Sequence, residues 1–245
     1  MKAGEQDLRT QVIPNGKTAL ALLMLAPALA VGLVFALAGN PYPEKAGAAL
    51  KAKKVVVLGA VGGTPKPACP RNCQVIASVT GFQTEIAGRK LPFKVPFDGR
   101  ITGWKIFLGK PTKRDRRLLD DKWGRPPQAA IAVLKQRRSG KYELKRRSPT
   151  VSLGNKLGQT PYFKLNQPLR AVKGDQVALA VPTWVPAFTS GLSRSRNAWR
   201  AGRSPKNCRP GNESVTAQLK VGSSRVYGCR YVGSRLLFQV RLQAR

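Results

Sequence analysis

The chain has 245 residues, of which 44 are Lys or Arg and 11 are Asp or Glu, so its formal net charge is +33. A charge of this size attracts polyanions and opposes self-association, but it does not determine the fold. Histidine is absent, which excludes Ser-His-Asp catalysis, Cys-His catalysis and every His-ligated metal site. Hydrophobic residues make up 42% of the chain, enough for a sizeable core.

The first predicted element is an uncharged hydrophobic helix over residues 18–38, long enough to cross a bilayer. Basic residues precede it, the last being Lys17, and the run ends in small residues at Ala36 and Ala38, as a signal-peptidase site requires. Residues 1–38 are therefore interpreted as either a cleaved signal peptide or an uncleaved signal anchor. A buried core helix is a third interpretation, against which stands the lack of a polar face.

Both of the first two interpretations predict an exported protein. It is either secreted or anchored to the membrane through residues 18–38, with its main domain extracellular. Residues 39–68 are expected to form a basic, proline-containing linker. Within that linker, the apolar patch Val55–Leu58 predicts an edge strand, and a disordered tether is the alternative.

Four cysteines lie in the part predicted to be exported: Cys69, Cys73, Cys208 and Cys229. An even number of cysteines in an oxidising compartment indicates disulfides. Of the three connectivities, Cys69–Cys73 with Cys208–Cys229 is favoured, because each pair lies within one local segment. Zinc is not predicted, since Cys-x3-Cys and Cys-x20-Cys differ from the usual Cys-x2-Cys spacing.

From residue 69 onward, short apolar segments alternate with Gly- and Pro-containing turns, and no long amphipathic helix is predicted after residue 40. Strands are expected at Val75–Thr84, Arg100–Leu108, Ala129–Lys135, Tyr142–Lys145, Thr150–Leu153, Gln176–Val181 and Leu236–Leu242. Strands at this spacing are typical of a sandwich or jelly roll. The sequence therefore predicts an all-β, jelly-roll-like antiparallel β-sandwich over residues 69–245, preceded by the N-terminal hydrophobic helix.

Two of these strands have a clear period of two. In Arg100–Leu108, Trp104 and Ile106 are expected on one face, with Ile101 on the other. In the last strand, Leu236 and the apolar residues that follow it at every second position are expected to face the core. Arg235 and its alternate neighbours are expected to face solvent.

The order of several motifs resembles that of exported proteins of high-GC actinobacteria. These motifs are Val79-Thr80-Gly81-Phe82-Gln83, then PFDGRITGWKI, WGRPPQAAIAVL and KGDQVALAVPTWVPAF. The resemblance covers roughly residues 69–245. It implies a secreted, jelly-roll-like sandwich and implies no activity.

The aromatic residues Trp184, Phe188 and Trp199 are candidate ligand-binding residues. Prolines flank Trp184, and residues 190–203 read as a Ser/Arg-rich loop that contains Trp199. Rigid exposed rings stack on the apolar faces of sugars, so these three predict a carbohydrate platform. The alternative is that they cap one end of the core.

The candidate acids are Asp98, Asp115, Asp120, Asp121 and Asp175. Asp115, Asp120 and Asp121 each lie beside cations in the sequence. Asp98 and Asp175 lie at tight turns, where an Asp side chain caps backbone groups. Local pairing is therefore the favoured interpretation. A calcium site at Asp120 and Asp121 and a two-carboxylate hydrolase remain alternatives. No catalytic residue, cofactor or metal is predicted.

Basic runs at 110–117, 135–138, 145–147 and 194–209 are expected mostly on loops. No element suited to entering a nucleic-acid groove is apparent, so no specific nucleic-acid partner is expected. The leading hypothesis is a non-enzymatic exported envelope or secreted module that associates with an anionic cell-wall polymer or polysaccharide. The alternatives are a carbohydrate-binding module and a carboxylate-dependent hydrolase.

Overall fold

The structure is a computed structural model that describes residues 53–208 and 216–245. The predicted signal segment, residues 1–38, and its helix at 18–38 lie outside these residues, as does the first part of the predicted linker. Over the two ranges that are described, no helix has both the length and the apolar character needed to span a bilayer.

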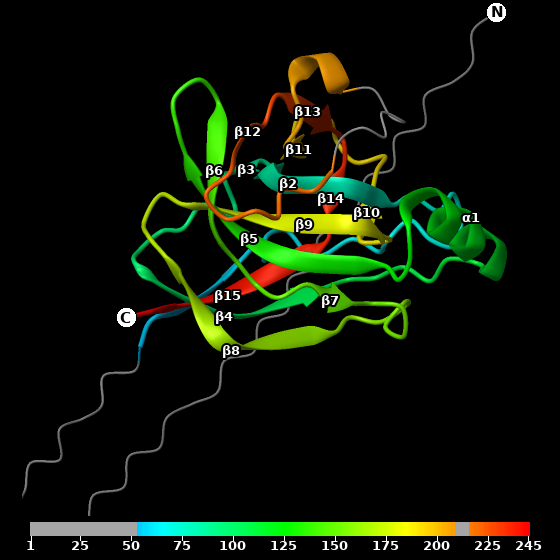
Figure 1. Ribbon diagram of the computed structural model, residues 1–245, viewed down its shortest axis with the longest axis horizontal. Coiled ribbons are helices and arrows are strands. Elements are labelled where there is room, and N and C mark those ends of the chain that lie inside the picture. Colours follow the sequence, from blue (N-terminus) through cyan, green and yellow to red (C-terminus); the bar gives the residue numbers. More distant parts are fainter. Residues whose placement is uncertain (1–52, 209–215) are drawn as a thin grey trace, which may run out of the picture. The chain divides into compact units, whose positions relative to one another are not determined.

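The domain consists of two antiparallel layers (Figure 1). The smaller layer is a four-stranded sheet, drawn below the other in Figure 1. Its strands are, in order, β1 (Val55–Leu58), β15 (Phe238–Ala244), β4 (Gly99–Ile106) and β8 (Tyr162–Ala171). The predicted edge strand at Val55–Leu58 is confirmed, because it pairs with β15.

The larger layer is a nine-stranded sheet. Seven strands follow the order β12 (Ser224–Val226), β6 (Lys141–Arg147), β5 (Gln128–Gln136), β9 (Gln176–Val185), β2 (Ile76–Ile86), β11 (Ala198–Ala201) and β13 (Cys229–Val232). Two short strands complete it: β3 (Arg89–Lys90) on β2 and β7 (Val151–Ser152) on β5. A separate ribbon joins β10 (Phe188–Thr189) to β14 (Arg235–Leu236).

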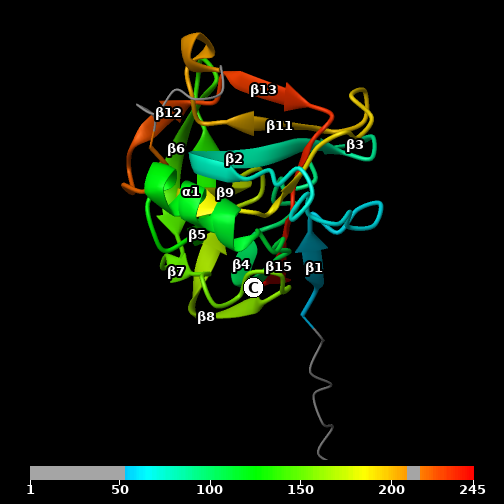
Figure 2. The ribbon, with the colours of Figure 1, turned by 90° about the vertical axis from the view of Figure 1, so that its right-hand side faces the viewer.

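Figure 2 shows the sheets curling toward each other as a half-barrel, with helix α1 (Lys113–Trp123) to one side. A short 3-10 helix, η1 (Pro205–Asn207), precedes the second disulfide. The predicted all-β sandwich is confirmed. Both favoured disulfides are confirmed as well, because Cys69 pairs with Cys73 and Cys208 pairs with Cys229.

The main core lies between the layers, where Ile131 and Val133 of β5 belong to the same buried cluster as Trp104 of β4. A second cluster covers the outer face of the large sheet, where Ala130 and Ala132 of β5 pack near buried aromatic rings. Strand β5 is therefore apolar on both faces, which explains why its sequence is a continuous apolar run and does not alternate.

The prediction that Ile101 and Trp104 face opposite sides of their strand is wrong. Both side chains are buried in the main core. The pairing between β15 and β4 shifts register, because the adjacent residues Leu242 and Arg241 pair with Ile101 and Gly103, so Thr102 is an extra residue in β4. A bulge of this kind resets the alternation and returns Trp104 to the face that Ile101 occupies.

The predicted solvent exposure of Arg235 is also wrong, because only 4% of this residue is exposed. The predicted core side of this run is confirmed, because Leu236, Phe238, Val240 and Leu242 are all buried in the main core. The run is two strands, since β14 ends at Leu236 and β15 begins at Phe238. The Arg235 guanidinium donates to the carbonyl oxygens of Gly63 (2.7 Å) and Gly59 (3.2 Å). Burial lowers the pKa of this guanidinium.

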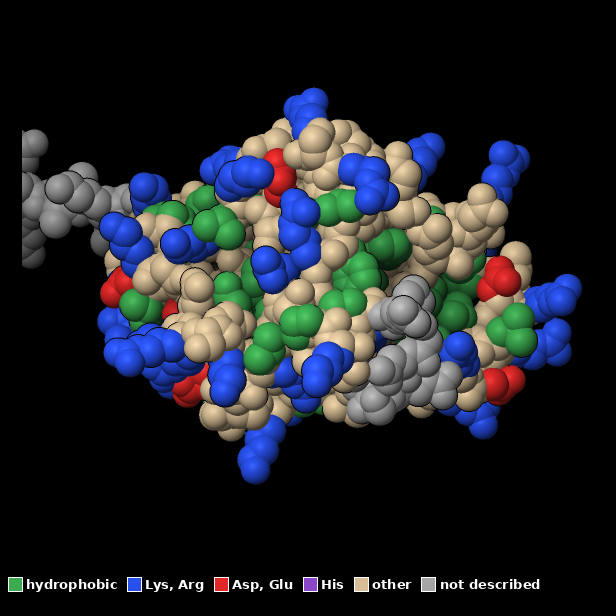
Figure 3. All heavy atoms as spheres, turned by 90° about the horizontal axis from the view of Figure 1, so that it is seen from above, with side chains coloured by type: hydrophobic (Ala, Val, Ile, Leu, Met, Phe, Trp, Pro, Cys, Tyr) green, Lys and Arg blue, Asp and Glu red, His purple; other side chains and the backbone are tan. Residues whose placement is uncertain are grey.

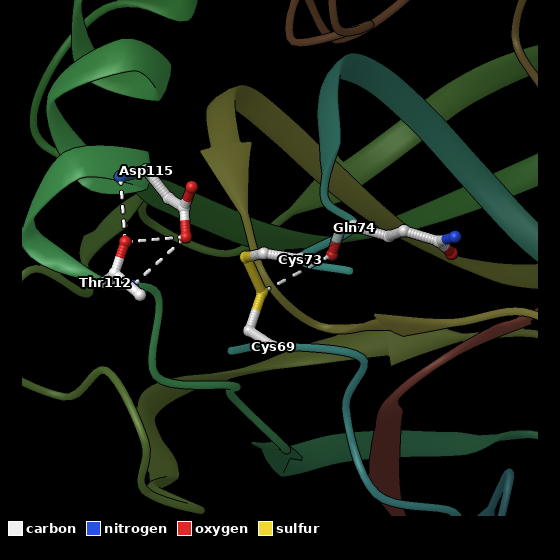
Figure 4. The surroundings of a disulfide bond; sticks show 5 residues. All are labelled: Cys69, Cys73, Gln74, Thr112 and Asp115. Atoms are coloured by element: carbon white, nitrogen blue, oxygen red, sulfur yellow. Dashed lines mark hydrogen bonds between the residues drawn. A yellow bond between two sulfur atoms is a disulfide. The ribbon is translucent and has the colours of Figure 1, made fainter. Parts of the chain in front are cut away.

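Helix α1 was not predicted, and the basic run at 110–117 was expected on a loop. None of its residues is fully buried, and the half-buried ones, at positions 115, 119, 120 and 123, include two acids, so its apolar stripe is short. Its local signal is a capping box, in which the Thr112 hydroxyl accepts from the Asp115 N–H while the Asp115 carboxylate accepts from the Thr112 N–H (Figure 4). Strand β11 likewise replaces part of the predicted loop at 190–203.

Removal of each disulfide should destabilise the domain to a different extent. The Cys208–Cys229 bridge closes a loop with a sequence separation of 21, against 4 for Cys69–Cys73. On the chain-entropy model, Cys208→Ala/Cys229→Ala should lower the free energy of unfolding by about 3 kcal/mol and Cys69→Ala/Cys73→Ala by about 2 kcal/mol. Urea denaturation without reductant measures both, and the opposite order would contradict this assignment.

Arg235→Ala should lower the free energy of unfolding by about 2 kcal/mol, because it removes the hydrogen bonds to the Gly63 and Gly59 carbonyl oxygens and the packing of a buried side chain. The control is Arg241→Ala, which removes an exposed arginine from the adjoining strand and should change stability by less than about 0.5 kcal/mol. Equal effects of the two substitutions in urea denaturation would show that the buried contacts of Arg235 contribute nothing.

Candidate functional site

Trp184, the central residue of the predicted carbohydrate platform, is fully buried. It lies on β9 opposite Ala77 of β2, and its indole Nε1 donates to Asp120 Oδ1 of α1 at 3.0 Å. The ring thus anchors the helix to the large sheet and presents no face to a sugar. For Trp184, the structure agrees with the alternative that the ring caps the core.

Trp199 and Phe188, by contrast, both line an open hollow of about 250 Å³, which we call the aromatic hollow. Trp199 is 6% exposed and stacks on Tyr231, with ring centroids 4.6 Å apart. The Phe188 ring meets Trp199 edge-on at 6.2 Å. The remaining wall residues are Val75, Ile76, Ala77, Val79, Trp123 and Arg203.

The sequence analysis missed Trp123, the last residue of α1, which contributes a partly exposed ring to this hollow. Lys122 Nζ lies 5.2 Å from the centroid of that ring. Because Tyr231 covers one face of Trp199, the ring of Trp123 is better placed to stack on a ligand than the ring of Trp199. Without a predicted helix at 113–123, no sequence signal brought Trp123 near the other aromatic residues.

A second hollow lies where the β8–β9 turn approaches β5 and β6, and we call it the basic hollow. Its volume is about 420 Å³. Five cationic residues line it: Lys135, Lys145, Arg146, Arg170 and Lys173. They come from the predicted basic runs at 135–138 and 145–147, from β8 and from the β8–β9 connection. The fold therefore gathers cations that are far apart in the sequence.

Few carboxylates offset this charge. Asp175 also lines the hollow, but it is 7% exposed and its carboxylate accepts from the Val172 N–H at 2.9 Å. Lys145 pairs with Glu143 at 2.9 Å, and its hydrogen bond, together with one from Arg137, holds the pKa of Glu143 below its ordinary value. Within residues 53–208 and 216–245, no ion pair with a carboxylate involves Lys135, Arg146, Arg170 or Lys173.

Three of the other candidate acids, Asp98, Asp115 and Asp120, hold structural contacts. Asp98 accepts from the Lys173 N–H at 2.8 Å, and Asp115 caps α1. Asp120 accepts from Trp184 and lies 3.8 Å from Arg116. In the described part of the chain, no group of three Cys, Asp or Glu side chains could hold a metal ion.

The space-filling view in Figure 3, from above, shows cationic side chains spread over that face with few acidic ones among them. In the comparisons with known proteins, no family model, no curated protein and no solved structure matches this chain. The kind of ligand is therefore inferred from the chain's own residues alone. Among the described residues, one hollow offers five cations, of which only Lys145 has a carboxylate partner, and the other offers aromatic rings.

Trp184→Phe should loosen α1 without emptying the core, because it keeps a ring and removes the hydrogen bond to Asp120. We expect the free energy of unfolding to fall by about 1 to 2 kcal/mol and amide exchange in residues 113–123 to quicken. Trp123→Phe is the control, since it changes the same residue type at the partly exposed end of α1. Unchanged exchange in Trp184→Phe would contradict the anchoring role.

Proposed function

We propose that the protein is a non-enzymatic exported module that binds anionic polymers of the cell surface electrostatically. The basic hollow is the observation that carries this proposal, because its cations lie close together with few carboxylates to neutralise them. The two disulfides support it, since such bonds persist in oxidising compartments outside the cytoplasm.

The chemistry of the hollow favours phosphate or carboxylate groups. A guanidinium such as that of Arg146 can donate two parallel hydrogen bonds to either group, and the lysine ammonium groups add point charges. Near an anionic surface each cation contributes about 1 kcal/mol before screening by salt. Several cations in one hollow therefore give useful affinity for a repeating polyanion without requiring one exact sequence of sugars or phosphates.

Nucleic acid fits this proposal less well than a surface polymer. The single long helix of the described residues, α1, carries Asp115, Asp120 and Asp121 among its cations. A hydrogen bond from Trp184 of β9 to Asp120 holds this helix against the large sheet. The helix is therefore poorly suited to entering a duplex groove. Outside the cytoplasm, wall-linked phosphate polymers and acidic polysaccharides are the available polyanions.

The test is titration calorimetry with a soluble inorganic polyphosphate at 50 mM and 500 mM NaCl. We expect the affinity to fall at least about tenfold at the higher salt, because binding releases condensed counterions. Arg146→Ala/Lys173→Ala should weaken binding several-fold further at low salt and flatten the salt dependence.

The matched control is Lys66→Ala/Arg241→Ala, which removes the same charge from exposed positions outside the hollow. Equal losses in the two double variants would show that net charge alone drives binding and would reject the basic hollow as the site. Affinity that is the same at both salt concentrations would reject the electrostatic mechanism.

The aromatic hollow supports a second candidate function, carbohydrate binding, because Trp123, Phe188, Trp199 and Tyr231 line one opening. Arg203 lines it too, so an acidic sugar suits it better than a neutral one. Trp123→Ala should abolish any sugar-induced change in tryptophan fluorescence, whereas Trp184→Phe should leave a sugar-induced change in place. A panel of neutral and acidic oligosaccharides that produces no change would dismiss this candidate.

A further inference from the structure

A third hollow lies beside the basic hollow, and its walls are mostly apolar. We call it the apolar hollow; its volume is about 420 Å³, within the range of small-molecule pockets. Its lining consists of Trp104, Arg147, Pro149, Val151, Phe163, Lys164, Leu165, Asn166, Gln167 and Leu169. It opens where β8, at the end of the small sheet, approaches β6 of the large sheet.

The inner wall of this hollow is a continuation of the main core. Trp104 of β4 and Phe163 of β8 are paired across the sheet, with ring centroids 4.7 Å apart. Leu165 belongs to the same buried cluster, and Val151 and Leu169 pack against it. An apolar group that entered here would meet core side chains and leave water.

The apolar hollow and the basic hollow are lined by neighbouring residues on two strands, β6 and β8. Arg146 lines the basic hollow and Arg147 the apolar one, on successive positions of β6. On β8, Arg170 lines the basic hollow and Leu169, the residue before it, lines the apolar one. Successive residues of a strand point to opposite faces, but Arg146 pairs with Val133 of β5 and so faces the space between the sheets, as does Leu169 of the apolar hollow. One ligand of modest length that follows this space can therefore reach both hollows.

From this juxtaposition we propose that the two hollows bind a single-chain amphipathic anion. Its phosphate or carboxylate head lies among the cations of the basic hollow, and its alkyl chain lies against Phe163, Leu165 and Leu169. The head-group part rests on the proposed function of the basic hollow. The tail part is new, and it identifies the ligand class as lipid-like and not purely polymeric.

Charge complementarity is the reason for choosing this occupant. The cations of the basic hollow favour an acidic head, and Lys164, Asn166 and Gln167 give the apolar hollow a polar rim that suits the point where head and tail meet. A neutral apolar molecule would leave the cations unsatisfied. A free phosphate would leave the apolar walls in contact with water.

The experiment is calorimetric titration with butyl, hexyl and octyl phosphate, each below its micelle concentration, alongside inorganic phosphate and octyl maltoside. We expect the affinity to rise up to about fourfold for each added methylene that becomes buried. Octyl maltoside, which has the same tail and a neutral head, should bind at least about tenfold more weakly than octyl phosphate.

Two variants locate the tail. Leu169→Asn should flatten the dependence on chain length, and so should Val151→Thr, which keeps the branched shape of the side chain and places a hydroxyl in the wall of the hollow. Both should leave polyphosphate binding unchanged. Val221→Asn is the control, because Val221 is an exposed apolar residue outside the hollow, and it should keep the full chain-length series.

The possible outcomes separate this inference from the proposed function. If all alkyl phosphates bind as weakly as inorganic phosphate while polyphosphate still binds, the tail site is wrong and the polymer function stands. If octyl maltoside binds as tightly as octyl phosphate, the joint use of the two hollows is wrong. If neither alkyl phosphates nor polyphosphate bind, both proposals fail.

Discussion

Burial of the two central strands on both faces is the constraint on which the rest of this domain depends. Strands β5 and β9 contribute Ile131, Val133 and Leu179 to the core between the layers and small residues such as Ala130 and Ala180 to the outer cluster. Because these strands have no free face, polar and charged groups are displaced to the sheet edges and the turns. The basic and apolar hollows both lie at such an edge, between β6 and β8.

The few acidic residues in this part of the chain serve mainly to hold structure together, which is why cations remain unpaired. Asp175 and Asp98 accept from the backbone of the β8–β9 connection, and Asp120 accepts from Trp184. Each of these carboxylates keeps its negative charge, but within the described residues none forms an ion pair with a cation of the basic hollow. The positive field is therefore a consequence of how the acids are used as well as of how few there are.

Sequence patterns predicted the elements whose period is unbroken. They identified β9 and most of β15, the edge strand β1, and both disulfides from the closeness of each cysteine pair. They failed at Thr102 in β4, where one extra residue changes the period, and at Arg235, which is buried although the apolar residues after it alternate as predicted. They also missed α1, since the apolar stripe of this helix is short and two of its half-buried residues are acids.

The candidate site was less predictable than the fold, because it depends on which segments pack against each other in the tertiary structure. Nothing in the sequence around Trp184 shows that α1 lies over it, and so a ring expected at the surface is buried. The basic runs were visible, but their convergence required the pairing of β6 with β5 and the position of the β8–β9 turn.

The most direct measurement is the mapping of polyphosphate binding by amide chemical shifts in an ¹⁵N NMR titration of the folded domain. The proposed function predicts that the largest shift changes fall on residues 135–146 and 170–175, which border the basic hollow. Changes spread evenly over the cationic surface, or centred on Trp123 and Tyr231, would contradict it.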